Sequence, residues 1–288
     1  MRKIGFFLVS ALLLCTSCTK IRQAFNSLTA TAENFEEETA KNAAGQRFIK
    51  VNFCSADSMV VLSTDFPLTN EGRLTDSIIA FIGQCFEGFD RAYAQTHDPQ
   101  KALDKVGNAI HYNYKKDIKT MRSELESDAD EELPEYLFAW EYESTLEKEY
   151  DLERYITLVN NAYEFQGGVH GMPYFNGVTF DKTTGRRIDE SILTNTQSAV
   201  FKALYKKKLL DYFLSEEEDG ETGYLSEYLL IEPENLTLGE MRLTDHSIVF
   251  TYQPYEIAPY ACGFPTVELT FQQMKPYLTD EGLRLIGE

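Results

Sequence analysis

A glycine-rich segment with one histidine is the first part of the sequence whose residue types are suited to chemistry: Gln166-Gly167-Gly168-Val169-His170-Gly171. Histidine titrates near neutral pH and can act as an acid, a base or a metal ligand. Glycines permit a positive φ or the close approach of another group. The segment therefore predicts a tight turn in which His170 bonds local backbone groups, a ligand loop with His170 and Tyr174 at its rim, or, as a third interpretation, a metal or acid–base site.

A second segment rich in proline and tyrosine runs from Gln253 to Pro265 and contains Tyr255, Glu256 and Tyr260. Its three prolines and one glycine predict an irregular connection between two strands. A tyrosine can bury its ring while its hydroxyl reaches a polar partner. Glu256, between Tyr255 and Ile257, is expected to be partly buried and bonded to backbone N–H groups. The segment is either a structural latch or a binding surface, such as one on which a sugar stacks.

The partners that catalysis by His170 would need are not evident. Zinc takes three or four ligands, and the other histidines stand at no ligand-like spacing from His170: His97, His111 and His246. No nucleophile elbow, phosphate loop, zinc-protease helix or dinucleotide motif is present in the sequence. We therefore predict no metal, no cofactor and no enzymatic activity. An envelope hydrolase that pairs His170 with Glu256 or Asp181 stays open as an alternative.

The elements that position these segments follow from hydrophobic periodicity. Helices are expected from Leu74 to Tyr93, from an Asp98 cap and Pro99 to about Glu126, and over 197–213, with a short helix near 272–278. Strands are expected over 49–54, 59–62, 136–142, 155–159, 178–180, 236–243, 247–253 and 266–271, with a hairpin turn over 181–185. Helices grouped between runs of strands predict an α+β fold with antiparallel sheets, packed helices and two small subdomains.

The N-terminus predicts export. Arg2 and Lys3 precede an apolar run from Ile4 to Leu14 that is typical of a signal peptide and too short to span a bilayer. Small residues directly before Cys18 resemble a lipoprotein cleavage site, so we expect 1–17 to be removed, Cys18 to be lipidated and 18–46 to form a tether; an ordinary secretory signal is the alternative. The Thr-Lys-Ile-Arg sequence after Cys18 lacks an acidic run, which favours a lipid-anchored, periplasm-facing position in the cell envelope.

Charge limits the partners of the exported body. The whole chain carries a net charge of −19, and loss of Arg2 and Lys3 would make it −19 − 2 = −21. Such a charge disfavours nucleic acid and favours basic partners. Three cysteines remain after export, Cys54, Cys85 and Cys262, and their apolar neighbours predict buried free thiols, although one disulfide is possible. The acidic segment 216–221 lacks calcium-loop spacing.

Three motifs in order resemble one known family. Gly-Gly-Val-His-Gly at 167–171, Phe-Asp-Lys-Thr-Thr-Gly-Arg at 180–186, and Tyr-Glu-Ile-Ala-Pro-Tyr-Ala-Cys-Gly at 255–263 are similar to the RsiV/PdaC-type envelope domain. The resemblance covers about 150–278 and places a companion N-terminal α+β domain at 47–149 before a C-terminal domain at 150–288. It implies an extracytoplasmic domain without established catalysis, which serves in the anti-sigma branch as a lysozyme receptor.

Together these observations predict a membrane-anchored binding or sensing module. Its expected ligands are peptidoglycan, another glycan or a basic envelope protein such as lysozyme, and its membrane contact is the N-terminal lipid. The expected ligand-binding residues are Gly167, Gly168, His170, Gly171, Tyr174, Tyr255, Glu256 and Tyr260. A structural envelope protein, in which both loops are packed latches, is the remaining alternative.

Overall fold

The computed structural model describes residues 47–68, 72–128, 133–215 and 223–288, and Gln46–Glu288 forms one compact unit. The expected signal peptide, Cys18 and the tether over 18–46 lie outside the described residues, as does the acidic segment 216–221. None of the helices in the described part has the length and hydropathy that a membrane span requires.

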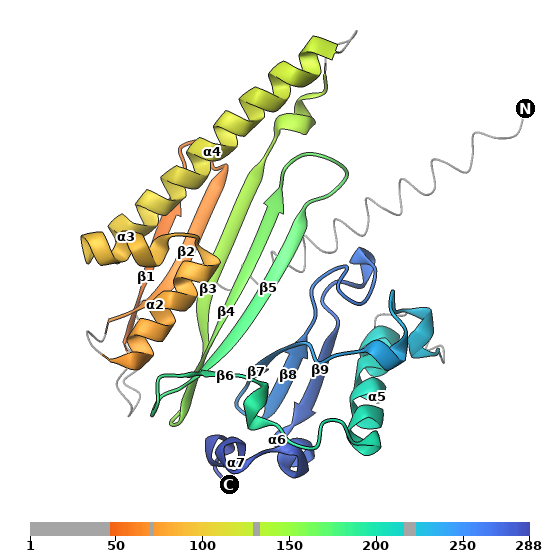
Figure 1. The fold of residues 1–288 in the computed structure, drawn as a ribbon. Helices are drawn as coiled ribbons and strands as arrows, with labels where there is room; N and C mark the ends of the chain where they lie inside the picture. The colour runs from red at the N-terminus through yellow and green to blue at the C-terminus, as the bar shows by residue number, and fades with distance from the viewer. Residues whose placement is uncertain (1–46, 69–71, 129–132, 216–222) are drawn as a thin grey trace, which may run out of the picture. The chain divides into compact units, whose positions relative to one another are not determined.

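Two sheets carry the fold (Figure 1). The larger sheet has six strands in chain order: β1 (Phe48–Cys54), β2 (Val60–Pro67), β3 (Glu141–Asp151), β4 (Tyr155–Phe165), β5 (Met172–Asp181) and β6 (Arg187–Ile188). All its neighbours are antiparallel except β2 and β3, which are parallel. The smaller sheet is antiparallel and contains β7 (Glu240–Leu243), β8 (Ser247–Thr251) and β9 (Thr266–Thr270). The sequence boundary expected at 149/150 falls inside β3.

Three helices connect β2 to β3 and lie on one face of the larger sheet (Figure 1): α2 (Arg73–Cys85), α3 (Phe89–Thr96) and α4 (Pro99–Asp128). The parallel pairing requires such a crossover, because a tight turn can only join antiparallel strands. Inward residues of the strands and helices form the first core, which includes Leu62, Ile82, Phe89, Leu103 and Leu158. The α+β fold class predicted from the sequence is confirmed.

Helix α4 begins where the sequence predicts it. The Asp98 carboxylate accepts a hydrogen bond from the backbone N–H of Lys101 at 3.1 Å, and Pro99 is the first helical residue. The single helix expected from Leu74 to Tyr93 is instead two helices. Helix α2 ends at Cys85, where Phe86 is extended, and Gly88, with φ of 86°, redirects the chain into α3.

A second core lies between the smaller sheet and helices α5 (Ala199–Ser215), α6 (Phe271–Met274) and α7 (Asp280–Ile286) (Figure 1). Two buried threonines of the larger sheet, one on β4 and one on β5, bond the backbone of β7. The Thr157 hydroxyl donates to the carbonyl of Leu243 at 2.7 Å, and the Thr179 hydroxyl accepts from the N–H of Leu243 at 2.9 Å. Buried backbone groups of β7 thus keep their hydrogen bonds where the two sheets meet.

Several boundaries differ from the predicted ones. The strand predicted over 136–142 begins only at Glu141, because a 3-10 helix occupies Glu135–Phe138. Strand β2 continues through Pro67 instead of ending before it. The prediction of three buried thiols is wrong for Cys54, which is free and exposed because β1 turns Val51 and Phe53 toward the core; Cys85 and Cys262 are free and partly buried.

Candidate functional site

The glycine segment is the loop between β4 and β5, and its glycines have distinct tasks. Gly167 and Gly168 have φ of 83° and 97°, in the region where side chains are disfavoured. Gly171 has an ordinary φ, but a Cβ there would lie 2.3 Å from the phenol of Tyr163. The sequence prediction of positive φ or close approach is therefore confirmed, and the loop places His170 just before the start of β5.

The second segment connects β8 to β9 and is anchored to β5 by one side chain. The amide of Gln253 accepts from the N–H of Phe175 at 3.2 Å and donates to the carbonyl of the same residue. Glu256 accepts from the N–H of Gln253 at 2.8 Å. The expected backbone bond of Glu256 is thus present, but its expected burial is wrong, since the residue is exposed. Ile257 and Ala258 are buried and hold the middle of the segment in the second core.

The two segments meet in an aromatic cluster made of His170, Tyr255 and Tyr260. The imidazole stacks on the ring of Tyr260 with centroids 4.1 Å apart and on the ring of Tyr255 with centroids 6.4 Å apart. The Tyr260 hydroxyl donates to the carbonyl of Gly171 at 3.0 Å. The structure therefore brings together residues that lie 85 or more positions apart in sequence.

Hydrogen bonding assigns the tautomer of His170. Its Nδ1 lies 2.9 Å from the carbonyl oxygen of Gly171, which can only accept, so Nδ1 carries the hydrogen. In the neutral imidazole Nε2 is then an acceptor, and the Tyr255 hydroxyl at 3.3 Å is its donor. Among the described residues His170 forms no hydrogen bond or ion pair with a carboxylate or a cysteine, so the acid–base pair of the hydrolase hypothesis is not assembled here.

Asp181, the other carboxylate of that hypothesis, is committed to structure. It is 1% exposed, and its oxygens accept from the N–H groups of Thr183 and Thr184 and from the guanidinium of Arg284. Burial opposes ionisation of Asp181, but the bonds from Thr183 and Arg284 outweigh it and hold the pKa below its ordinary value. Asp181 therefore fixes the turn after β5 and ties it to α7.

Tyr255 combines exposure with an unfavourable backbone. Its φ is 67°, in the left-handed region that costs a non-glycine residue roughly 1–2 kcal/mol, yet 49% of the residue is exposed. Its neighbour Tyr252 is fully buried and bonds the hydroxyl of Tyr205 at 2.8 Å. Tyr252 and Tyr205 therefore form the latch of this region, which our sequence reasoning missed. The ring of Tyr255 is left at the surface.

Tyr174 does not join the aromatic cluster. Side chains alternate along β5, and Tyr174 shares the face of Val178 and Phe180, which belong to the core beneath α2–α4. The ring of Phe175, on the opposite face, meets the ring of Phe264 in the Gln253 segment with centroids 6.1 Å apart. The rim position expected for Tyr174 stays a prediction, because the sequence order of Tyr174 and His170 does not specify on which face of the sheet Tyr174 lies.

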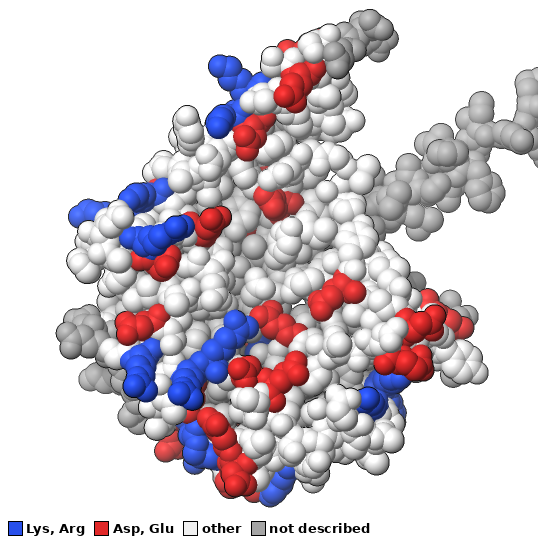
Figure 2. Space-filling view, in the orientation of Figure 1, with Lys and Arg blue, Asp and Glu red and all other residues white. Residues whose placement is uncertain are grey.

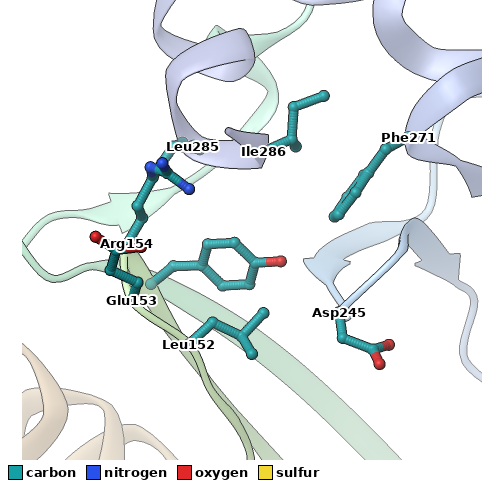
Figure 3. A pocket seen from close by; sticks show the side chains of 8 residues that line it. Leu152, Glu153, Arg154, Asp245, Phe271, Leu285 and Ile286 are labelled. Carbon is teal, nitrogen blue, oxygen red and sulfur yellow. The ribbon is translucent and has the colours of Figure 1, made fainter. Parts of the chain in front are cut away.

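Concave pockets lie elsewhere. A pocket of about 250 Å³ has Arg154 and Asp245 on its sides and the apolar side chains of Leu152, Phe271 and Ile286 between them (Figure 3). Another, of about 190 Å³, lies beside α2 and is lined by Phe81, Phe180 and Arg187 among others. Both are below the usual size of a small-molecule site, and neither contains a residue of the aromatic cluster. In the part of the chain that the structure describes, no three His, Cys, Asp or Glu side chains are grouped as metal ligands would be.

Two segments of the chain match family models. Residues 191–272 match the family model described as a protein of unknown function, DUF3298, and residues 84–173 match the family model described as deacetylase PdaC. The predicted resemblance to PdaC-type proteins is thereby confirmed for residues 84–173. The more specific assignment to the RsiV branch stays a prediction.

Two solved structures are similar to this chain. A DUF3298 family member from Bacteroides fragilis has a TM-score of 0.62 and 18% identity, over 84% of this chain and 96% of that chain. A DUF3298 family protein from Pseudomonas aeruginosa has a TM-score of 0.48 and 12% identity, over 82% of this chain and 94% of that chain. No curated protein matches. The first similarity shows a shared α+β fold and says nothing about a ligand.

Proposed function

We propose that this protein is a lipid-anchored binding module of the bacterial cell envelope, which recognises a glycan through the aromatic cluster. The observation that carries the proposal is Tyr255, an exposed aromatic residue held in a left-handed backbone conformation. A residue with unfavourable backbone geometry persists where its surroundings fix it, and such residues concentrate at ligand sites. A latch would have buried the ring, as Tyr252 does.

The geometry of the cluster suits a ligand with a flat face. The rings of Tyr255 and Tyr260 are 5.7 Å apart and inclined by 33°, and His170 stacks on both. The negative face of a tyrosine ring attracts the positively polarised C–H groups of a sugar. Val169, 94% exposed, extends the apolar surface beside them. The cluster is preorganised by the backbone bonds of Gly171 and by Gln253, so a ligand orders little on binding.

A binding assay tests this role. Purified protein would be incubated with purified peptidoglycan at low salt, and the retained fraction measured for the natural chain, for Tyr255→Ala and for Tyr112→Ala. Tyr112 is 68% exposed on α4. It is the matched control, because Tyr112→Ala also removes an exposed tyrosine ring, but one that lies outside the cluster. We expect retention to fall at least tenfold for Tyr255→Ala alone. Equal retention of the two variants, or no retention of the natural chain, contradicts glycan recognition by the cluster.

The charge of the chain supports a second ligand class. With 46 acidic and 27 basic residues, the net charge of −19 favours a basic protein such as lysozyme. Acidic side chains gather at several places on the face shown in Figure 2. The test is capture of lysozyme by the natural chain and by Tyr255→Ala. If both capture lysozyme at low salt and lose it at about 0.5 M salt, the binding is due to this net charge.

A catalytic role is the alternative that the name of the PdaC family model raises. We propose binding without turnover, because the described contacts of His170 are phenols and a backbone carbonyl. Incubation with acetylated peptidoglycan should release no acetate above the blank. Acetate release that His170→Ala abolishes would replace the binding proposal with a deacetylase.

The anchor has its own test. Mass spectrometry of the protein purified from membranes should find an N-terminus at Cys18 carrying diacylglycerol, and Cys18→Ala should release the body from the membrane fraction. A chain that still begins with Met1 would overturn the envelope address.

A further inference from the structure

We propose a second binding site, for an ammonium group, on the helix-side face of the larger sheet around Glu164. Its members are an acidic residue, an amide and four aromatic residues, and we call it the Glu164 site: Glu164, Gln166, Tyr114, Trp140, Tyr142 and Tyr174. It lies on the face of β4 and β5 opposite to the one that contacts the Gln253 segment.

Strand register brings the sheet residues together. Tyr142 on β3 stands directly opposite Glu164 on β4, and Tyr174 on β5 stands opposite Ala162, diagonal to Glu164. Directly opposite Cβ atoms are about 4.5–5.5 Å apart and diagonal ones about 7–8 Å. All three side chains point to the same face, because each is an even number of residues from a core residue of its strand, Leu146, Leu158 or Val178. One carboxylate is thus flanked by two phenol rings.

The carboxylate of Glu164 is held by neutral donors. Its Oε1 accepts from the hydroxyl of Tyr114 on α4 and from the amide of Gln166, the latter at 2.6 Å. Among the described residues Oε2 has no hydrogen-bond partner, and Glu164 forms no ion pair with Lys, Arg or His. The carboxylate is therefore positioned by one oxygen, while its negative charge is not neutralised by the protein.

Aromatic rings complete the surroundings. Trp140 meets Tyr114 edge to face, with centroids 5.4 Å apart and planes at 89°. Burial raises the pKa of Tyr142 and of Tyr174, and the negative charge of Glu164 raises both further. Both phenols are therefore neutral at physiological pH. Tyr174 is 41% exposed, which leaves the site open to solvent.

The chemistry of these groups selects a cation. Ring faces attract ammonium groups most strongly where water is excluded, and a nearby carboxylate adds a direct charge interaction. The Tyr114 and Trp140 planes are perpendicular, so together they do not form the flat platform that a sugar would need.

The sequence supplies a local reporter, because Trp140 is the single tryptophan of the chain. Tryptophan fluorescence would be followed while the full chain is titrated with choline, a quaternary ammonium probe. The neutral isostere 3,3-dimethyl-1-butanol serves as the ligand control. We expect saturable change with choline and none with the alcohol. Equal responses to both probes would refute recognition of the charge.

Variants assign the response to named groups. Glu164→Gln keeps an acceptor for Tyr114 and removes the charge, and we expect it to weaken choline binding at least tenfold. Tyr174→Ala should weaken binding severalfold, and Tyr174→Phe, which retains the ring, should bind more tightly than Tyr174→Ala. Glu124→Gln, an exposed acidic residue elsewhere on α4, is the charge-matched control and should bind as the natural chain does.

Two results would overturn the proposal. One is undiminished choline binding by Glu164→Gln, and the other is a saturable response to N-acetylglucosamine with none to choline, which would make the site a sugar site. If Glu164→Gln fails to fold, the comparison of Tyr174→Ala with Tyr174→Phe still decides the role of the ring. Because the readout is Trp140 rather than peptidoglycan retention, failure here is distinct from failure of the aromatic cluster.

Discussion

The left-handed backbone of Tyr255 allows a prediction that separates a site from a latch. We compare Tyr255→Ala with Tyr255→Gly. Both remove the ring and its stacking on His170, so the difference between them reports the backbone alone. Alanine at a φ of 67° keeps a cost of roughly 1–2 kcal/mol. Glycine avoids this cost but loses roughly 0.4–1 kcal/mol through its freer unfolded chain. We therefore expect the glycine variant to be more stable than the alanine variant by about 0.5–1 kcal/mol.

The loss relative to the natural chain is also bounded by the structure. The residue is half exposed, and its described partners are two rings and one long hydrogen bond of 3.3 Å. Aromatic pairs contribute roughly 0.5–1.5 kcal/mol beyond burial. Tyr255→Ala should therefore cost about 1–2 kcal/mol, and Tyr255→Gly should be within about 1 kcal/mol of the natural chain. Tyr252→Ala, at a fully buried ring, should cost about 3–5 kcal/mol.

Urea denaturation followed by circular dichroism measures both quantities. With a slope of about 3 kcal/mol per molar, the two Tyr255 variants should differ in midpoint by roughly 0.2–0.3 M. A glycine variant no more stable than the alanine variant would refute the strained backbone. A loss above about 3 kcal/mol for Tyr255→Ala would make the ring a core anchor and would support the latch.

Three further predictions concern packing, pH and thiols. Gly107→Ala should destabilise the protein by about 1–3 kcal/mol in urea, because its Cβ would lie 2.2 Å from the Phe53 ring; an unchanged midpoint would contradict this packing. The lowered pKa of Asp181 contributes stability above the ordinary aspartate pKa that is lost as pH falls through the folded pKa, so the acid loss of stability should be shallower in Asp181→Asn, measured as midpoint against pH. Burial raises the pKa of Cys85 to about 12, so a thiol reagent at pH 8 should label exposed Cys54 first and Cys85 last; the reverse order in peptide mapping would contradict the described burial.

The sequence predicted those features well that depend on interactions between neighbouring residues. The Asp98 cap and Pro99 start α4, and the turn over 181–185 joins β5 to β6, because both depend on neighbouring residues. The break between α2 and α3 was missed. Glycine is tolerated inside helices, so Gly88 alone did not reveal that it would adopt a left-handed conformation.

The sequence predicted the two segments of the site, but not the tertiary contacts between them. Glycine and proline marked the two segments, but only the fold shows that His170 stacks on Tyr260. Tyr252 and Tyr255 look alike in sequence, and their opposite burial depends on how β8 leaves the second core. The Glu164 site has no sequence signature, because its residues come from α4, from three strands and from the positions beside β3 and β4, and they meet only in the fold.

The parallel pairing of β2 with β3 imposes an order on biogenesis. Val60 finds its partner Tyr142 only after the helices between them have been synthesised, and distant pairings of this kind form slowly. Until then the β1–β2 hairpin presents the open edge of β2, which can join a strand of another nascent chain. A holding chaperone that shields this hairpin would therefore raise the yield of native protein more than one that acts on the C-terminal sheet, whose three strands are close neighbours in sequence.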